Sequence, residues 1–173
     1  MRTIVVLVTC FLISCTSWAQ SKNAKNQDSS PGEVFFGYSF LNGETLSKAS
    51  GWDASVMGNV RDWLGVKADF SGHYKSDGPF HDHEYNILFG PQVSDHIDRL
   101  TAFAHGLIGV SHFGTNIGPN STGAGWVLGG GLDYDWTHNF AVRFAQLDYH
   151  GAHVFDQTQK DFRFSVGLVY KFK

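Results

Sequence analysis

The chain has 173 residues, of which 17% are charged and 15% aromatic, with 20 glycines and a formal net charge of −3. This length suits one domain with a single core. The weak negative charge excludes the broad basic surface that nucleic-acid binding needs, so we expect no nucleic-acid partner. The glycine and aromatic content favours short strands with tight turns over a helical enzyme.

The first 19 residues have the features of a secretory signal peptide. Arg2 precedes an apolar run over residues 4–13, and Ser17-Trp18-Ala19 forms a small-x-small cleavage site. The run is too short to cross a bilayer as a helix, which takes about 20 apolar residues. Cleavage after Ala19 would remove both cysteines of the chain.

A second interpretation of this segment stays open. Leu12-Ile13-Ser14-Cys15 also resembles the lipobox of bacterial lipoproteins, in which the cysteine is lipidated and becomes the mature N-terminus. Both interpretations carry the protein across the inner membrane.

Residues 20–32 are polar, charged or turn-forming apart from one alanine, and such a segment is expected to be a flexible tether. From Glu33 to Lys173 we find no second shift in composition. We therefore expect one domain over residues 33–173.

Alternation of apolar and polar residues predicts strands in this domain. The clearest runs cover residues 52–60, 64–74, 126–136 and 161–172. Their apolar faces carry no charged residue, whereas the opposite faces carry eight. This separation of charge is typical of strands whose two faces lie in different environments.

Four further strands are predicted at residues 36–40, 85–93, 100–112 and 140–149, which makes eight. The inner face of 100–112 stays open, because Phe103 and Leu107 share a face with His105. In the run 140–149 the apolar phase changes, and a β-bulge near Ala145 would explain the change.

The connections alternate in length. Short joins are expected near residues 61–63, 94–99 and 137–139, and four longer loops at 42–51, 75–82, 113–125 and 151–160. Short turns at one end and long loops at the other are typical of bacterial transmembrane barrels.

Side-chain volume predicts which face points inward. An eight-stranded barrel has room inside only for a filling of side chains, and the apolar set is too bulky for it. We therefore reject a soluble, lipocalin-like barrel and place the bulky set against lipid. Aromatic side chains near the strand ends would form the interfacial girdles, namely Trp52, Tyr74, Trp126, Tyr134, Trp136 and Tyr170.

The chain resembles the OmpA-like and opacity-type outer-membrane barrels of Gram-negative bacteria. The resemblance rests on Gly129-Gly130-Gly131-Leu132-Asp133-Tyr134, on Arg143-Phe144-Ala145-Gln146-Leu147-Asp148-Tyr149 and on the closing alternation Phe164 to Phe172. It implies an all-β, eight-stranded antiparallel up-and-down transmembrane barrel in the cell outer membrane.

The resemblance also implies partners, namely outer-membrane lipid, lipopolysaccharide and the outer-membrane assembly machinery. Two features depart from the family. Lys173 follows the aromatic Phe172 on which such chains commonly end, and the sequence shows no counterpart of the peptidoglycan-binding domain of OmpA. A wall-anchoring role is therefore not implied.

Charged side chains on the inner face must be paired, because an isolated buried ion costs several kcal/mol. We expect a structural polar network of Lys67, Arg143 and Arg163 with the inward carboxylates. The expected inward charged set is Asp53, Lys67, Asp69, Glu84, Asp133, Arg143, Asp161 and Arg163, joined by the histidines His73 and His105. A proton or ion path through this network is the alternative.

We nominate no catalytic residue, metal ligand or cofactor. The sequence His81-Asp82-His83 lacks a complete zinc ligand set. Lipid A deacylase, an eight-stranded outer-membrane hydrolase, uses a His-x-Ser spacing that is absent here. Ser111 and His112 are adjacent, so on a strand their side chains point to opposite faces.

The leading functional hypothesis is a structural or surface-interaction scaffold that presents four extracellular loops to a ligand that the sequence does not identify. A narrow porin-like channel is the alternative, and an outer-membrane hydrolase is the third.

Overall fold

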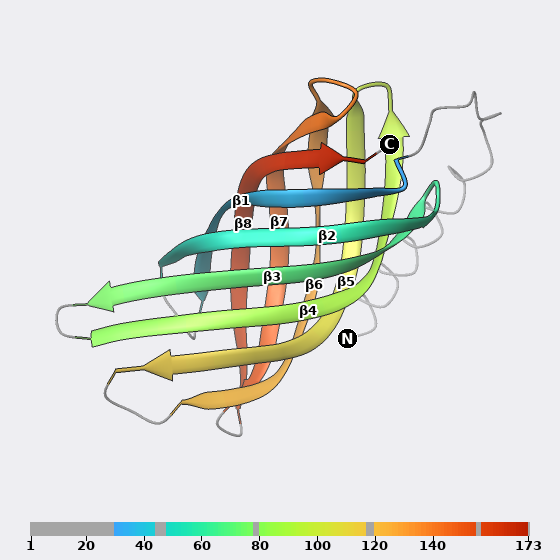
Figure 1. Cartoon of the computed structure of the whole chain (residues 1–173). Helices are drawn as coiled ribbons and strands as arrows, with labels where there is room; N and C mark the ends of the chain where they lie inside the picture. The colour runs from blue at the N-terminus through green and yellow to red at the C-terminus, as the bar shows by residue number, and fades with distance from the viewer. Residues whose placement is uncertain (1–29, 44–47, 78–79, 117–119, 155–156, 173) are drawn as a thin grey trace, which may run out of the picture.

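The structure is a computed structural model that describes residues 30–43, 48–77, 80–116, 120–154 and 157–172. The predicted signal peptide, including the Cys15 of the lipoprotein interpretation, lies outside the described residues, as does nearly all of the polar tether. The described chain forms eight strands (Figure 1): β1 (Gly32–Gly43), β2 (Ala49–Arg61), β3 (Leu64–Asp77), β4 (Phe80–Ile97), β5 (Leu100–Thr115), β6 (Ser121–Asp135), β7 (Phe140–Val154) and β8 (Gln157–Lys171).

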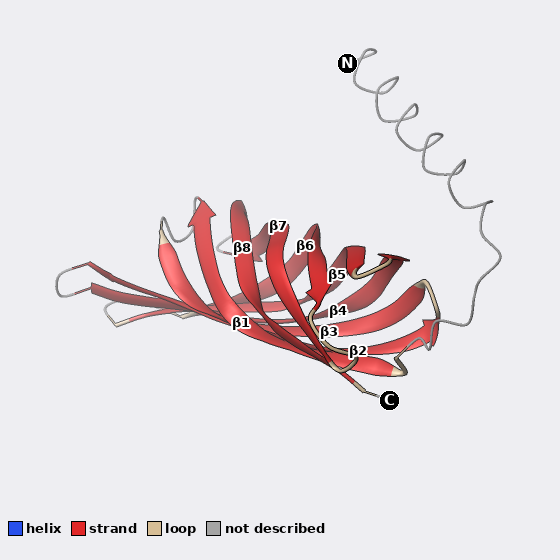
Figure 2. Cartoon of the chain, turned by 90° about the horizontal axis from the view of Figure 1, so that it is seen from above, coloured by secondary structure: helices blue, strands red, loops and turns tan. Residues whose placement is uncertain are grey.

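The strands form one closed antiparallel barrel. Each strand pairs with the next along the chain, and β8 pairs with β1 to close the ring. Figure 2 shows the strands side by side, joined by short connections. Within the described residues, no helix is long and apolar enough to cross a membrane. The predicted all-β, eight-stranded up-and-down topology is confirmed.

The two ends of the barrel differ. Three tight connections lie at one end: the β2–β3 turn at 62–63, the β4–β5 turn at 98–99 and the β6–β7 turn at 136–139. The amide of Phe172 donates a hydrogen bond of 2.9 Å to the carbonyl of Gly32, so both ends of the barrel chain meet there too. We call this the turn end and the opposite one the loop end.

The connections at the loop end are shorter than the sequence suggested. Residues 75–82 were expected to form a loop, yet β3 runs to Asp77 and β4 begins at Phe80. Much of the predicted loops 113–125 and 151–160 is likewise strand, because polar residues satisfy the backbone ladder as well as apolar ones do. In both views the β3–β4 hairpin projects furthest at this end (Figures 1 and 2).

A bulge interrupts β7 where the alternation changes phase. The β7–β8 register shifts between Arg143 and Gln146, and the β6–β7 register shifts between Leu132 and Asp133. The bulge predicted near Ala145 is confirmed. Because of the extra residue, Arg143 and Gln146 both face the interior although they are three positions apart.

Most large apolar side chains face outward, as the alternation predicted. Phe36, Ile108 and Leu147 are each more than 60% exposed on the outer wall of the barrel. The face left open for the fifth strand is also settled, because Phe103 and His105 are both buried inside. Of the six predicted girdle residues, four are exposed and two, Trp52 and Trp126, are half-buried.

Neighbouring glycines explain why these two tryptophans are partly covered. A Cβ placed on Gly72 would lie 2.7 Å from the indole nitrogen of Trp52. A Cβ on Gly151 would meet the ring of Trp126 in the same way. Each indole therefore lies directly against a glycine of the next strand, where any larger residue would displace it.

Candidate functional site

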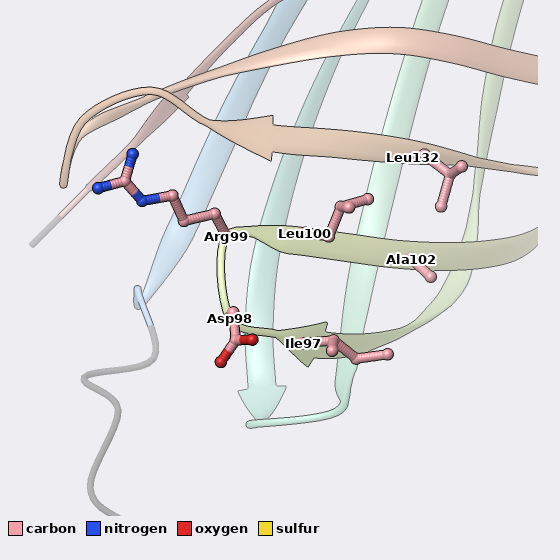
Figure 3. Close-up of a pocket in the computed structure, with 6 residues that line it drawn as sticks. All are labelled: Ile97, Asp98, Arg99, Leu100, Ala102 and Leu132. Carbon is pink, nitrogen blue, oxygen red and sulfur yellow. The ribbon is translucent and has the colours of Figure 1, made fainter.

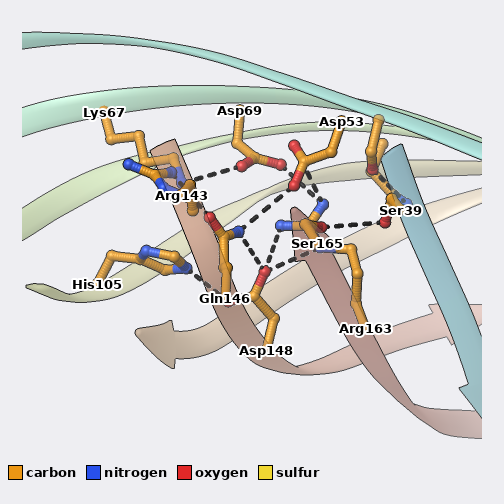
Figure 4. A network of polar contacts seen from close by, with 12 residues as sticks. Ser39, Asp53, Lys67, Asp69, His105, Arg143, Gln146, Asp148, Arg163 and Ser165 are labelled. Atoms are coloured by element: carbon orange, nitrogen blue, oxygen red, sulfur yellow. Dashed lines mark hydrogen bonds and ion pairs between the residues drawn. The ribbon is translucent and has the colours of Figure 1, made fainter. Parts of the chain in front are cut away.

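The interior of the barrel holds the candidate site. All eight charged residues of the expected inward set are at most 2% exposed, and His73 and His105 are buried with them. Their side chains come from β2 to β8 and lie in the interior of the barrel. Figure 4 shows six of these ten residues together between the strands: Asp53, Lys67, Asp69, His105, Arg143 and Arg163. The contacts form three layers between the turn end and the loop end.

Arg143 on β7 is the centre of the layer nearest the turn end. Its Nε and Nη2 donate to the two carboxylate oxygens of Asp133 at 2.7 and 2.9 Å, a bidentate pair that fixes the guanidinium plane. Its Nη1 donates to Oε1 of Gln146 at 2.8 Å. The guanidinium carbon also lies 4.4 Å from the ring centroid of Phe35 and 4.1 Å from that of Phe103, so Arg143 makes cation–π contacts with both rings.

Arg163 on β8 is the centre of the middle layer. Its Nε and Nη2 donate to one oxygen of Asp148 on β7, at 2.9 and 2.7 Å. Its Nη1 donates to Asp69 on β3 at 2.9 Å and lies 3.9 Å from Asp53 on β2. The ammonium of Lys67 lies 3.2 Å from the second oxygen of Asp69. Arg163 therefore ties strands together across the barrel as well as along its wall.

Gln146 connects the two arginine layers. Its amide oxygen accepts from Arg143, while its amide nitrogen donates to Asp148 at 2.7 Å and to Asp53 at 3.4 Å. His105 reaches the same cluster, with Nε2 3.0 Å from the free oxygen of Asp148. The polar contacts are thus continuous from Asp133 to Asp53.

The expected inward set omitted Gln146 and Asp148, although both are central to the network. Their faces depend on the β7 bulge, which shifts the alternation by one residue. The available signal was the change of phase after Phe144, which identifies the bulge but not which contacts it creates.

The third layer lies towards the loop end and includes Glu84, His150 and Ser111. Glu84 accepts a hydrogen bond from the amide of Asn86 at 2.8 Å and lies 3.5 Å from Nδ1 of His150. The other ring nitrogen of His150 lies 3.5 Å from the hydroxyl of Ser111. Glu84, His150 and Ser111 therefore follow the acid, base, nucleophile order of a hydrolase.

The contacts of this cluster are longer than those of an activated nucleophile. Both distances exceed the 2.6–3.2 Å that is typical of a contact between a nucleophile and its base. Ser111 is also 0% exposed, so no substrate can reach it without rearrangement. Sequence reasoning missed the cluster because Ser111 and His150 lie 39 residues apart on β5 and β7.

A separate hydroxyl cluster lies at the seam of the barrel. The hydroxyl of Ser39 on β1 lies 2.9 Å from Nε2 of His73, and Ser165 on β8 donates to Ser39 at 3.1 Å. These contacts link β1, β3 and β8 at the place where the ring closes.

Apolar side chains also occupy the interior, which is less uniformly polar than the sequence suggested. Leu88, Leu107 and Val127 form one buried cluster. A second consists of Phe35, Ala141 and Val169. The polar network is therefore enclosed by apolar groups, which lower the local dielectric and strengthen its ion pairs.

Among the described residues, the charged groups that are at most 2% exposed comprise six carboxylates and three cations, so acids exceed bases in this part of the interior. Across the part of the chain that the structure describes, no three His, Cys, Asp or Glu side chains are grouped so as to hold a metal ion. What the arrangement offers chemically is a rigid, ion-paired interior.

No protein-family profile matches the chain, and no curated protein sequence matches it. Solved structures do match. The neisserial surface protein A, NspA, is 17% identical, with 83% of this chain and 98% of that chain covered at a TM-score of 0.70. This chain has the fold of an eight-stranded outer-membrane barrel.

Two further barrels share the fold. Ail, the attachment invasion locus protein of Yersinia pestis, is 16% identical over 83% of this chain and 99% of its own, with a TM-score of 0.58. The outer membrane protein OprG of Pseudomonas aeruginosa is 10% identical over 83% and 96%, with a TM-score of 0.53. At these identities the likeness concerns the fold.

Proposed function

We propose that this protein is an outer-membrane barrel that serves as a structural or surface-interaction scaffold. The observation that carries the proposal is the interior, where Arg143 and Arg163 and their carboxylate partners fill the space as an ion-paired plug. A filled interior supports a rigid anchor better than a pore. The exposed apolar side chains of the outer wall would face lipid.

The orientation follows from the two ends. In outer-membrane barrels the short turns lie in the periplasm and the longer connections outside the cell. The turn end would therefore face the periplasm, and the loop end, with its projecting β3–β4 hairpin, would face the outside. Export would use the N-terminal signal peptide, insertion the outer-membrane assembly machinery, and the outer wall would contact lipid and lipopolysaccharide.

The projecting strands offer the surface for interaction. The outward positions of β4 and β5 above the aromatic girdle carry His81, His83 and His112, and Lys160 is exposed on β8. Ail has been crystallised with the heparin analogue sucrose octasulfate. That complex supports a polyanionic glycan as the first probe for this surface.

The first experiment is to compare electrophoretic mobility of boiled and unboiled protein in isolated outer membranes. A closed membrane barrel is expected to migrate faster before heating, because it resists SDS until heated. A soluble periplasmic protein of constant mobility would contradict the proposal.

The second experiment tests the interaction surface. Sucrose octasulfate is titrated against the folded protein and against a variant in which His81, His83, His112 and Lys160 are replaced by Gln. Equal binding by both proteins would remove this surface from the proposal.

The second candidate function is a narrow channel. It is favoured by the excess of interior carboxylates and by the continuous polar contacts from Asp133 to Asp53. Single-channel recordings in planar bilayers distinguish the two. The scaffold predicts no steady conductance in the wild type, whereas steady conductance that Arg143→Leu alters would favour the channel.

A further inference from the structure

An apolar groove opens on the outer wall at the turn end (Figure 3). It has a volume of about 570 Å³ and lies beside the β4–β5 turn. Ala102 on β5 pairs with Leu132 on β6, and its small side chain leaves the space between Leu132 and Leu100 open. Ile97 on β4 forms the opposite side. The groove is therefore lined by aliphatic groups and is accessible from the outer face of the barrel.

Opposite charges stand at the end of this groove. Asp98 and Arg99 form the β4–β5 turn and are both exposed. In Figure 3 the side chains of Arg99 and Asp98 extend from the turn, away from Leu132. A carboxylate and a guanidinium thus lie next to one mouth of an apolar groove.

On the basis of the function proposed above, we propose that this groove binds a glycerophospholipid with an amine headgroup. One acyl chain lies between Ile97, Leu100 and Leu132, where its burial is driven by the hydrophobic effect. Arg99 donates to the lipid phosphate, which guanidinium groups recognise in bidentate geometry. Asp98 pairs with the headgroup ammonium.

The level of the groove fits this occupant. The turn end faces the periplasm in the proposed orientation, so the turn would lie among the headgroups of the inner leaflet and the groove among the acyl chains below them. A headgroup that carries both a phosphate and an ammonium complements Arg99 and Asp98 together. A headgroup that carries only a phosphate would have no cation to pair with the carboxylate of Asp98.

The β2–β3 turn provides a matched comparison within the chain. Arg61, the last residue of β2, and Asp62 in the turn are also adjacent opposite charges at the same end of the barrel. Neither residue lines the groove. A lipid attracted only by an arginine near the membrane surface would treat Arg61 and Arg99 alike.

The test measures binding of phosphatidylethanolamine and phosphatidylglycerol to the refolded barrel in detergent by native mass spectrometry. The wild type is expected to prefer phosphatidylethanolamine. Arg99→Gln should weaken that lipid about tenfold, the equivalent of one charge-assisted hydrogen bond. Arg61→Gln should leave it unchanged within about twofold, which is the scale of an exposed surface charge.

Two further variants test the groove and the headgroup separately. Ala102→Phe fills the groove and should weaken both lipids. Asp98→Asn should reduce only the preference for the amine headgroup, and asparagine tolerates the left-handed backbone of this position, where φ is 56°. Equal effects of Arg99→Gln and Arg61→Gln, or equal binding of the two lipids by the wild type, would overturn the proposal.

Failure here is distinguishable from failure of the proposed function. Each variant is first checked for the mobility shift on heating, and Arg99 and Asp98 are surface residues whose replacement leaves the barrel core intact. A barrel that shifts on heating but shows no lipid preference contradicts only the groove. A protein without the shift contradicts the outer-membrane barrel itself.

Discussion

Arg163 holds Asp148 through two of its nitrogens, Nε at 2.9 Å and Nη2 at 2.7 Å, both directed at the same carboxylate oxygen. The two residues lie on β8 and β7 and pair in the ladder. With its third nitrogen on Asp69, Arg163 spans from one wall of the barrel to another. Because of these contacts, the interior side chains connect strands that are not neighbours as well as filling the space between them.

Replacing Arg163 with methionine should therefore destabilise the barrel strongly. The substitution keeps much of the side-chain volume but removes the guanidinium from Asp148 and from Asp69, which keeps its contact with Lys67, and this costs about 3–5 kcal/mol in the free energy of unfolding. Urea unfolding in detergent, followed by the mobility shift, measures the change. Arg61→Met at the exposed turn is the control and should change stability by less than about 0.5 kcal/mol. Similar effects of the two substitutions would contradict a stabilising role of the Arg163 contacts.

Asp133 and Arg143 should behave as a coupled pair. Asp133→Asn and Arg143→Gln each remove a charge from the bidentate contact, so the double variant should be less destabilised than the sum by at least about 1 kcal/mol. The same unfolding assay measures the wild type, the two single variants and the double variant, which together form a double-mutant cycle. Asp133→Asn combined with Arg61→Gln serves as the distant pair, for which the two effects should add within about 0.5 kcal/mol. Additivity of the first pair would show that the contact contributes little.

The extra residue of the β7 bulge should be dispensable for the interior network. Deleting Ala145 would leave Arg143 and Gln146 two positions apart, so both side chains would still face the interior of a regular strand. We expect this variant to keep the heat-dependent mobility shift. Deleting Val142 also removes one residue from β7, but it shifts Arg143 by one position against β8 and toward lipid, so this variant should lose the mobility shift. Loss of the shift in the Ala145 deletion would mean that the bulge itself is required for folding.

The stacking of Trp52 on Gly72 predicts an unequal effect of two alanine substitutions. Gly72→Ala would place a Cβ 2.7 Å from the indole nitrogen, and displacing the ring should cost about 1–3 kcal/mol. Gly58→Ala meets no atom within 4 Å and should be neutral or slightly stabilising. Unfolding midpoints of the two variants give the comparison. Equal midpoints would show that Trp52 moves aside without cost.

Ser111 should not act as a nucleophile in the folded barrel. Because it is fully buried and 3.5 Å from His150, a fluorophosphonate probe should leave it unlabelled over hours, while a serine hydrolase added to the same membranes is labelled. Labelling that disappears in Ser111→Ala would contradict this expectation and revive the hydrolase hypothesis.

The alternation of apolar and polar residues predicted eight strands and the outward direction of side chains such as Phe36, while the connection lengths and the family resemblance indicated a closed barrel. The strand period is a local property, and a barrel of eight strands is too narrow for the bulky set. The phase change in β7 was also visible as a bulge. The lengths of the loop-end connections could not be predicted, because polar residues beyond the apolar belt can form either strand or loop.

The sequence by itself thus determined the number of strands and the face on which most of them carry their charge, and the family resemblance implied the topology of the barrel. The tertiary structure decided which charges meet: Arg163 with Asp148 and Asp69, Arg143 with Asp133, and Gln146 between them. It also decided that Ala102 leaves a groove beside Arg99. These contacts join strands far apart in sequence, and their geometry depends on the register of every intervening pair and on one bulge, neither of which a local pattern encodes.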